Sequence, residues 1–201
     1  MKWLDFRGVL EKKRVLLFSS RNARAILGVP QKEALVTMHR WAKRGLIHRL
    51  RRDLYALGSA SLSDPYVANK LYEPSYISLE FALSYYGIIP ESVYAITSIT
   101  PRSPKRFEVQ GKAFTYRHIK KTAYAGYQTR QQQGLTFYIA EPEKAFVDLL
   151  YFRVLSRQRP LSRFSKARLN KDRALHFAKM FKNKKLTSIV LTTLRWYQKK
   201  H

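Results

Sequence analysis

Apolar positions in the first sixty residues recur every three or four residues, which is the period of a helix packed on one side. They predict three short helices, over residues 3–11, 19–27 and 31–44. Ser19 or Ser20 can cap the second helix, because a serine oxygen accepts an unpaired backbone N–H. Pro30 opens the third helix, and Gly45 is placed to end it in the left-handed conformation.

The third predicted helix has one apolar face and one basic face. Helical spacing groups five residues for packing: Ala34, Leu35, Met38, Trp41 and Ala42. The opposite side carries Lys32, Val36, Arg40 and Lys43, with Glu33, Thr37 and Arg44 beside them. One face is therefore expected to pack against the domain while the other stays positive.

A basic hairpin follows this helix. Residues 46–50 and 54–57 read as two strands joined by Arg51, Arg52 and Asp53. Helices, a tight turn, a further helix and a two-stranded wing are the order of a winged helix-turn-helix, whose last helix enters the DNA major groove. A basic helix face alone is usually only solvated. Here the turn, the apolar spacing, the glycine stop and the basic hairpin coincide, and together they favour DNA binding.

Positions on this surface predict two kinds of DNA contact. Four residues are expected to reach base edges: Gln31, Lys32, Thr37 and Arg40. Four others suit phosphates: Lys43, Arg44, Arg51 and Arg52.

After residue 60 the pattern mixes helices and strands. Helices are expected over residues 64–72 and from Ser75 or Ser78 to Gly87. β-Branched and aromatic residues predict strands over residues 93–100, 107–109, 114–119 and 135–140. We expect an α+β fold with a winged helix over residues 1–60 and a small antiparallel-sheet domain over residues 61–152.

Tyrosines are frequent in this second domain, and two interpretations compete. Aromatic sheet surfaces can stack on unpaired RNA bases, but core packing is favoured because most of these tyrosines lie on apolar periodic segments. The six considered are Tyr72, Tyr76, Tyr85, Tyr86, Tyr94 and Tyr116.

Pro142, Glu143 and Lys144 form a motif that invites a catalytic interpretation together with Glu141 and Asp148. Structure also explains it, because proline and glutamate favour helix starts and Lys144 can pair with Asp148 one turn later. The five histidines lack metal-ligand spacing, and no phosphate-binding glycine loop or nucleophile elbow is present. We predict no active site, no metal and no cofactor.

Charge is concentrated at the two ends of the chain, whose net charge is +26. Basic and acidic residues number 14 and 4 over residues 1–60, 10 and 8 over residues 61–150, and 15 and 1 over residues 151–201. Such an excess favours an extended anion as partner. Cysteine is absent, the start MKWLDFRGVLEKKR returns to charge too early for a signal peptide, and no apolar run spans a membrane. A soluble cytoplasmic protein is expected.

The last segment, residues 153–201, is predicted to be basic, helical and packed on the second domain. Helices are expected over residues 171–181 and 186–197. Their packing residues are Leu175, Phe177, Ala178, Phe181, Ile189, Val190, Leu194 and Trp196. Because this excess of positive charge repels itself, a polyanion or an acidic protein is the expected partner.

Two long motifs carry a family resemblance: LSDPYVANKLYEPSYISLEFALSYYGIIPESVYAITSIT and YIAEPEKAFVDLLYF. With the N-terminal pattern, over about residues 5–152, they resemble the AbiEi-type antitoxins of bacterial abortive-infection (type IV toxin–antitoxin) systems. The resemblance implies a winged helix that binds double-stranded DNA and represses its own promoter, with the reading helix at residues 31–44 and the wing tip at Arg51 and Arg52.

The resemblance also implies that the second domain counteracts a nucleotidyltransferase-like toxin without a stable complex. The family commonly has glycine where this chain has Asp53. Aspartate tolerates a left-handed backbone better than most residues, so the turn is expected to survive at some cost.

Two other functions compete with this regulator. An RNA-binding or ribonucleoprotein-associated module would use the basic C-terminus and keep the winged helix as a scaffold. A nuclease would show metal-dependent cleavage that Glu143→Ala abolishes.

Overall fold

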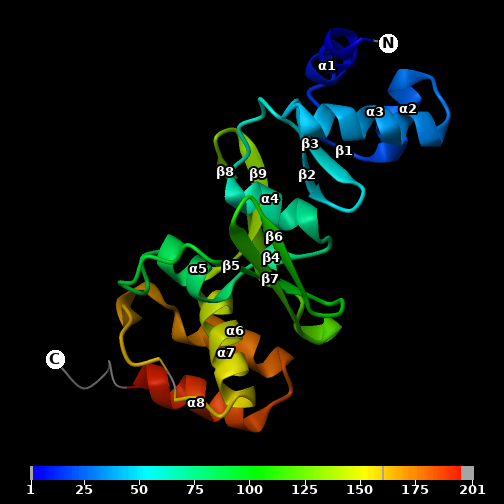
Figure 1. The fold of residues 1–201 in the computed structure, drawn as a ribbon. Helices are drawn as coiled ribbons and strands as arrows, with labels where there is room; N and C mark the ends of the chain where they lie inside the picture. The colour runs from blue at the N-terminus through cyan, green and yellow to red at the C-terminus, as the bar shows by residue number, and fades with distance from the viewer. Residues whose placement is uncertain (1, 160, 196–201) are drawn as a thin grey trace. The chain divides into compact units, whose positions relative to one another are not determined.

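The computed structural model describes residues 2–159 and 161–195, and the chain divides into two compact units between Leu62 and Ser63 (Figure 1). The fold is α+β. Among the described residues, no helix has both the length and the apolar character that a membrane crossing requires.

The first unit combines three helices with a three-stranded sheet. Its elements are α1 (Trp3–Lys12), β1 (Leu17–Phe18), α2 (Ser20–Leu27), α3 (Gln31–Lys43), β2 (Ile47–Arg51) and β3 (Leu54–Leu57). The strand order is β1-β3-β2, and both pairings are antiparallel. The three predicted helices and the hairpin are confirmed. The pattern did not predict β1, because two residues are too few to show a period.

Local chemistry sets the helix ends of this unit. Ser19 Oγ accepts the Asn22 N–H at 3.1 Å, and Asn22 Oδ1 accepts the Ser19 N–H at 2.9 Å, which closes a capping box at the start of α2. Gly28 ends α2 with φ at 66°, and Gly45 follows α3 with φ at 68°. These left-handed positions suit glycine because it lacks a Cβ.

An aromatic core holds α3 in the first unit. Trp41 lies with its ring centroid 4.7 Å from Phe6 and 5.0 Å from Trp3. Ala34, Met38 and Trp41 are buried, so they form the packing stripe of α3. Leu35 was also predicted on that stripe, but it is 44% exposed. It lies about 100° around the helix from Ala34, at the margin of the buried face.

The second unit contains a six-stranded sheet of order β6-β7-β5-β4-β9-β8. Its strands are β4 (Tyr76–Ile77), β5 (Ile96–Thr100), β6 (Lys105–Val109), β7 (Lys112–His118), β8 (Tyr127–Gln132) and β9 (Leu135–Ala140). The predicted antiparallel sheet is confirmed only in part: three of the five pairings are antiparallel, but β5 pairs with β7 and β4 pairs with β9 in parallel, so the sheet is mixed. Two strands lacked a signal: β4 is only two residues long, and β8 is polar throughout most of its length.

Helices cover both faces of this sheet. They are α4 (Asp64–Leu71), α5 (Leu79–Tyr85), α6 (Pro142–Leu155), α7 (Lys171–Met180) and α8 (Lys184–Arg195). Neighbouring side chains of β7 point to opposite faces of the sheet. Tyr116 donates to the Ala68 carbonyl of α4 at 2.5 Å, while Arg117 lies 3.7 Å from the Phe152 ring of α6. Helices α7 and α8 pack against α6 on its side of the sheet.

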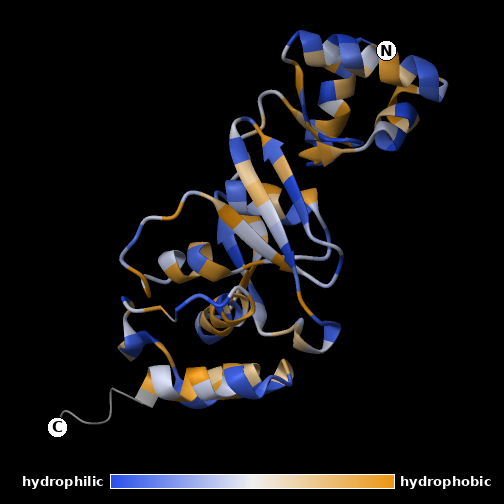
Figure 2. Cartoon of the chain, turned by 60° about the horizontal axis from the view of Figure 1, so that its bottom comes forward, coloured by the Kyte–Doolittle hydropathy of each residue, from blue (hydrophilic) through white to orange (hydrophobic). Residues whose placement is uncertain are grey.

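The C-terminal helices bury one stripe and expose the other. Buried residues include Ala174, Phe177, Ala178, Phe181, Leu186, Val190 and Leu194. Figure 2 shows α8, the last helix before the grey trace, with hydrophobic and hydrophilic residues along its length. The predicted end of this helix at residue 197, and with it Trp196, lies outside the described residues.

Only part of the predicted tyrosine packing is confirmed. Tyr76 and Tyr116 are fully buried, whereas Tyr85 is exposed and Tyr94 is 90% exposed. Tyr94 precedes β5 in a segment without regular structure, so the strand pattern that suggested its burial does not apply to it.

Candidate nucleic-acid interface

The outer face of α3 is exposed and mainly basic. Of the eight predicted contact residues, six have exposed side chains: Gln31, Lys32, Arg40, Lys43, Arg44 and Arg52. Thr37 and Arg51 are half-buried. Helical spacing places Lys32, Arg40 and Lys43 opposite the buried stripe, with Val36 between them.

The hairpin tip is tied to the starts of α2 and α3. Asp53 Oδ1 accepts from the Ser20 N–H at 2.8 Å and from the Ser20 hydroxyl at 2.5 Å. Gln31 Nε2 in turn donates to Ser20 Oγ at 3.1 Å. This network fixes the hairpin tip relative to the starts of α2 and α3. It also uses the side chain of Gln31, a predicted base-reading residue, for a hydrogen bond inside the domain.

Asp53 takes the left-handed conformation that the sequence predicted, with φ at 58°. Its contacts with Ser20 were not predicted, because they join residues 33 positions apart. The hydrogen bond from the Ser20 hydroxyl lowers the pKa of the Asp53 carboxyl. The aspartate therefore adds a charged anchor that glycine would lack.

Arginines at the hairpin tip differ in their roles. Arg51 Nη1 donates to the Arg52 carbonyl at 2.8 Å, and Arg49 Nε donates to the Arg51 carbonyl at 3.4 Å. These two side chains hold the turn backbone. Arg52 is exposed at the tip, in a position to contact a partner.

Sequence reasoning missed further polar residues near this surface. Arg21 and Arg24 are exposed on α2, and His39 is exposed on the outer side of α3, one turn before Lys43. The sequence signal for the two arginines was that α2 contains no acidic residue, which leaves its exposed side positive. The signal for His39 was its position four residues before Lys43, which puts both residues on the same face of the helix.

Acidic residues do little to neutralise this surface. The first unit has four of them, and Asp5 and Glu11 are both on α1. Asp5 accepts the Lys2 N–H at 3.1 Å, and Glu11 pairs with Arg7 at 2.7 Å. Glu33 in the first turn of α3 and Asp53 at the hairpin tip are the two carboxylates of residues 31–54, against seven lysines and arginines. The face formed by α3 and the hairpin therefore stays positive.

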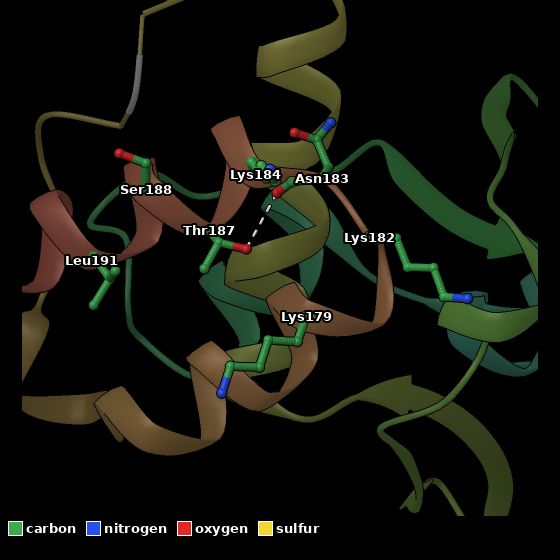
Figure 3. Close-up of a pocket in the computed structure, with 7 residues that line it drawn as sticks. All are labelled: Lys179, Lys182, Asn183, Lys184, Thr187, Ser188 and Leu191. Carbon is green, nitrogen blue, oxygen red and sulfur yellow. Dashed lines mark hydrogen bonds between the residues drawn. The ribbon is translucent and has the colours of Figure 1, made fainter.

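A second basic surface lies where α7 meets α8 (Figure 3). A shallow groove of about 540 Å³ is lined by Lys179, Lys182, Asn183, Lys184, Thr187, Ser188 and Leu191. Asn183 caps α8, accepting the Leu186 N–H at 3.0 Å. In Figure 3 the ammonium groups of Lys179 and Lys182 point away from each other. Because these charges diverge, the surface suits an extended anion better than a single phosphate group.

The charged residues of the motif around Pro142 are paired with one another or with the segment that begins α7. Lys144 and Asp148 are fully buried and pair with each other. Glu143 accepts the Asn170 N–H at 2.9 Å, and Glu141 pairs with Arg173. Each charged side chain thus has a partner that holds α6 or joins it to α7, as the structural interpretation predicted for Lys144 and Asp148.

Comparison with known proteins adds no assignment. A scan against protein-family models gives no match for this chain, and a search of curated proteins gives none either.

Replacing Asp53 is expected to loosen the hairpin tip. Asp53→Gly keeps the left-handed backbone but removes both bonds from Ser20, which should lower the free energy of unfolding of the first unit by about 1 kcal/mol. Asp53→Ala adds left-handed strain and should cost roughly 1 kcal/mol more. Denaturation followed by fluorescence in a Trp196→Phe background reports this unit, because Trp3 and Trp41 are the other tryptophans.

Acidification should reduce the loss of stability caused by Asp53→Gly. A lowered folded pKa stabilises the protein above the unfolded value of about 3.9, and this contribution disappears as pH falls through the folded pKa. The stability difference between the wild type and Asp53→Gly should therefore shrink below about pH 4. A difference that is constant from pH 7 to pH 3 would contradict a charge-dependent anchor.

Proposed function

We propose that the first unit is a winged helix-turn-helix domain that binds duplex DNA through α3 and the β2–β3 hairpin. The element order α1-β1-α2-α3-β2-β3, with β1 completing the sheet, is the arrangement of such domains. One observation carries the proposal: α3 buries Ala34, Met38 and Trp41 on one side and presents a basic stripe on the other.

Individual residues divide between reading and positioning in this proposal. Lys32 and Arg40, exposed on the outer face, contact base edges. Lys43, Arg44 and Arg52 contact phosphates. Gln31 supports the site through Ser20, and Arg51 does so through the tip backbone.

We further propose that the chain is an AbiEi-type transcriptional regulator, without enzymatic activity, that represses its own operon in the cytoplasm. Its second unit would counteract a nucleotidyltransferase-like toxin without a stable complex. Support comes from the motifs that resemble this family, which supply α4, α5 and β5 and then β9 and α6 of the second unit. A neighbouring gene for such a toxin is the genomic observation that this proposal expects.

RNA binding is the second candidate, and the lysine-lined groove between α7 and α8 favours it. Competition at about 0.15 M salt separates the two functions. We expect a duplex from the chain's own promoter to displace structured RNA of equal length, with little effect in the reverse direction. Stronger binding of the RNA would contradict the DNA proposal and support the alternative.

A further inference from the structure

A tyrosine-lined pocket of about 280 Å³ lies in the second unit, and none of its lining residues belongs to α7 or α8. Its lining residues are Asn69, Glu73, Pro74, Ser75, Tyr124, Tyr127 and Tyr138. They come from the end of α4, the segment before β4, the segment before β8, and strands β8 and β9 at one edge of the sheet. Neither the family resemblance nor the DNA-binding proposal uses this pocket.

Aromatic rings form an ordered wall of the pocket. The buried Tyr76 stacks on Tyr127 with centroids 4.8 Å apart and planes 15° apart, which fixes the Tyr127 ring. Tyr138 meets Tyr127 edge-on at 5.8 Å, and Tyr124 lies 5.4 Å from Tyr127. Tyr127 and Tyr138 remain 36% and 46% exposed. Two held rings thus offer surface for a planar ligand.

Asn69 fixes the backbone of this wall. Its Oδ1 accepts the Tyr138 N–H at 2.5 Å, and its Nδ2 donates to the carbonyls of Ser75 and Tyr138 at 3.3 and 3.4 Å. The short strand β4 pairs with β9 only at Ile139, so the amide takes the place of a missing strand partner. The pocket is therefore formed before any ligand binds.

We propose that this pocket binds a nucleobase, either of a free nucleotide or of an unpaired position in a nucleic acid. A base is planar and can stack on tyrosine rings such as Tyr127 and Tyr138, which keep exposed surface here. Beside the pocket, Lys70 pairs with Glu73 at 2.7 Å and Arg102 donates to the Glu73 carbonyl at 2.7 Å, so two cationic side chains adjoin a lining residue and can meet a phosphate attached to the base.

A cation held by the tyrosine faces is the competing occupant. Such cages use ring faces together with an available carboxylate. Here Glu73 already pairs with Lys70, and Arg102 lies beside it, so the carboxylate that such a cage needs is engaged. This favours the nucleobase.

Uncharged nucleosides test the proposal, because they cannot bind to basic surfaces through phosphate. We expect adenosine, guanosine, cytidine or uridine to show saturable binding to the full chain by calorimetry or ligand-observed NMR. Tyr138→Ala should weaken it about tenfold or more, and Tyr138→Phe, which keeps the ring, should bind like the wild type. Tyr94→Ala, which alters an exposed tyrosine outside the pocket, is the matched control and should bind like the wild type.

Two further titrations distinguish a base in a nucleic acid strand from a base in a free nucleotide. Tighter binding of a single-stranded tetranucleotide than of a mononucleotide would indicate unpaired nucleic acid, and equal binding would indicate a free nucleotide. The proposal fails if no nucleoside binds, if Tyr138→Ala binds normally, or if tetramethylammonium binds in place of nucleosides. Duplex DNA titrations of the same variants should match the wild type, so this outcome is separable from the DNA-binding proposal.

Discussion

Asp148→Ala is expected to destabilise the second unit by about 3–5 kcal/mol, a large part of the stability of a typical domain. Asp148 lies at the centre of α6 with no solvent exposure. It pairs with Lys144 and accepts from Ser78 Oγ at 2.8 Å and from the Tyr76 hydroxyl at 3.1 Å. Its removal would leave a buried ammonium among the rings of Tyr76 and Phe181 without a counter-ion.

A companion double variant separates charge from packing. Lys144→Met with Asp148→Leu should recover part of the loss, because an apolar pair avoids the desolvation of two charges. Recovery stays partial, since Tyr76 and Ser78 lose their acceptor. Unfolding is followed by tyrosine absorbance, because every tyrosine except Tyr55 belongs to the second unit. A double variant less stable than Asp148→Ala would contradict this account.

The single variant Lys144→Met should depend on pH with a defined sign. Burial raises the pKa of Asp148, and the neighbouring Lys144 opposes that rise. Without the lysine the folded pKa rises further, so the folded state binds the proton more tightly than the unfolded state does. The free energy of unfolding of Lys144→Met is lower than that of the wild type. This difference is therefore smallest below about pH 4 and grows as pH rises above it. A deficit that is larger in acid would contradict the assigned cause.

Lys43→Ala with Arg44→Ala is expected to weaken duplex binding by on the order of 50-fold at 0.1 M salt, with a similar loss for every sequence. Each phosphate contact contributes about 0.9 to the slope of log affinity against log salt, so the slope should fall by roughly 1.8. Lys43→Ala alone should flatten it by about one unit. Fluorescence anisotropy over a salt series measures both quantities.

A charge-matched variant controls for net charge. Lys12 and Lys13 are exposed at the end of α1, apart from α3 and the hairpin in sequence. Lys12→Ala with Lys13→Ala removes the same charge but should leave the salt slope unchanged. Equal slopes for the two double variants would show that diffuse charge, rather than the α3 surface, drives binding.

The local elements of the first unit were readable from sequence because their signals are short-range. Helical period, the Ser19 cap and Gly45 each act within a few residues, and all three are found in the structure. Contacts between residues far apart in the sequence could not be predicted. The contact between Asp53 and Ser20 joins the hairpin to α2, and no local pattern marks it.

The second unit shows the same limit more strongly. The sequence identified the Lys144–Asp148 pair because four residues make one helical turn. It did not identify the parallel pairings, because strand order depends on which segments meet across the fold. The tyrosine pocket escaped for a similar reason: Ser75, Tyr127 and Tyr138 meet only after β4, β8 and β9 are assembled.

An amide NMR titration of the full chain with a promoter duplex tests the central claim most directly. Duplex binding through the proposed surface predicts that the largest shifts fall within residues 32–44 and 49–53, and that Lys43→Ala reduces them. Shifts confined to α7 and α8, or an unchanged pattern for Lys43→Ala, would contradict the proposal that α3 and the hairpin hold the DNA.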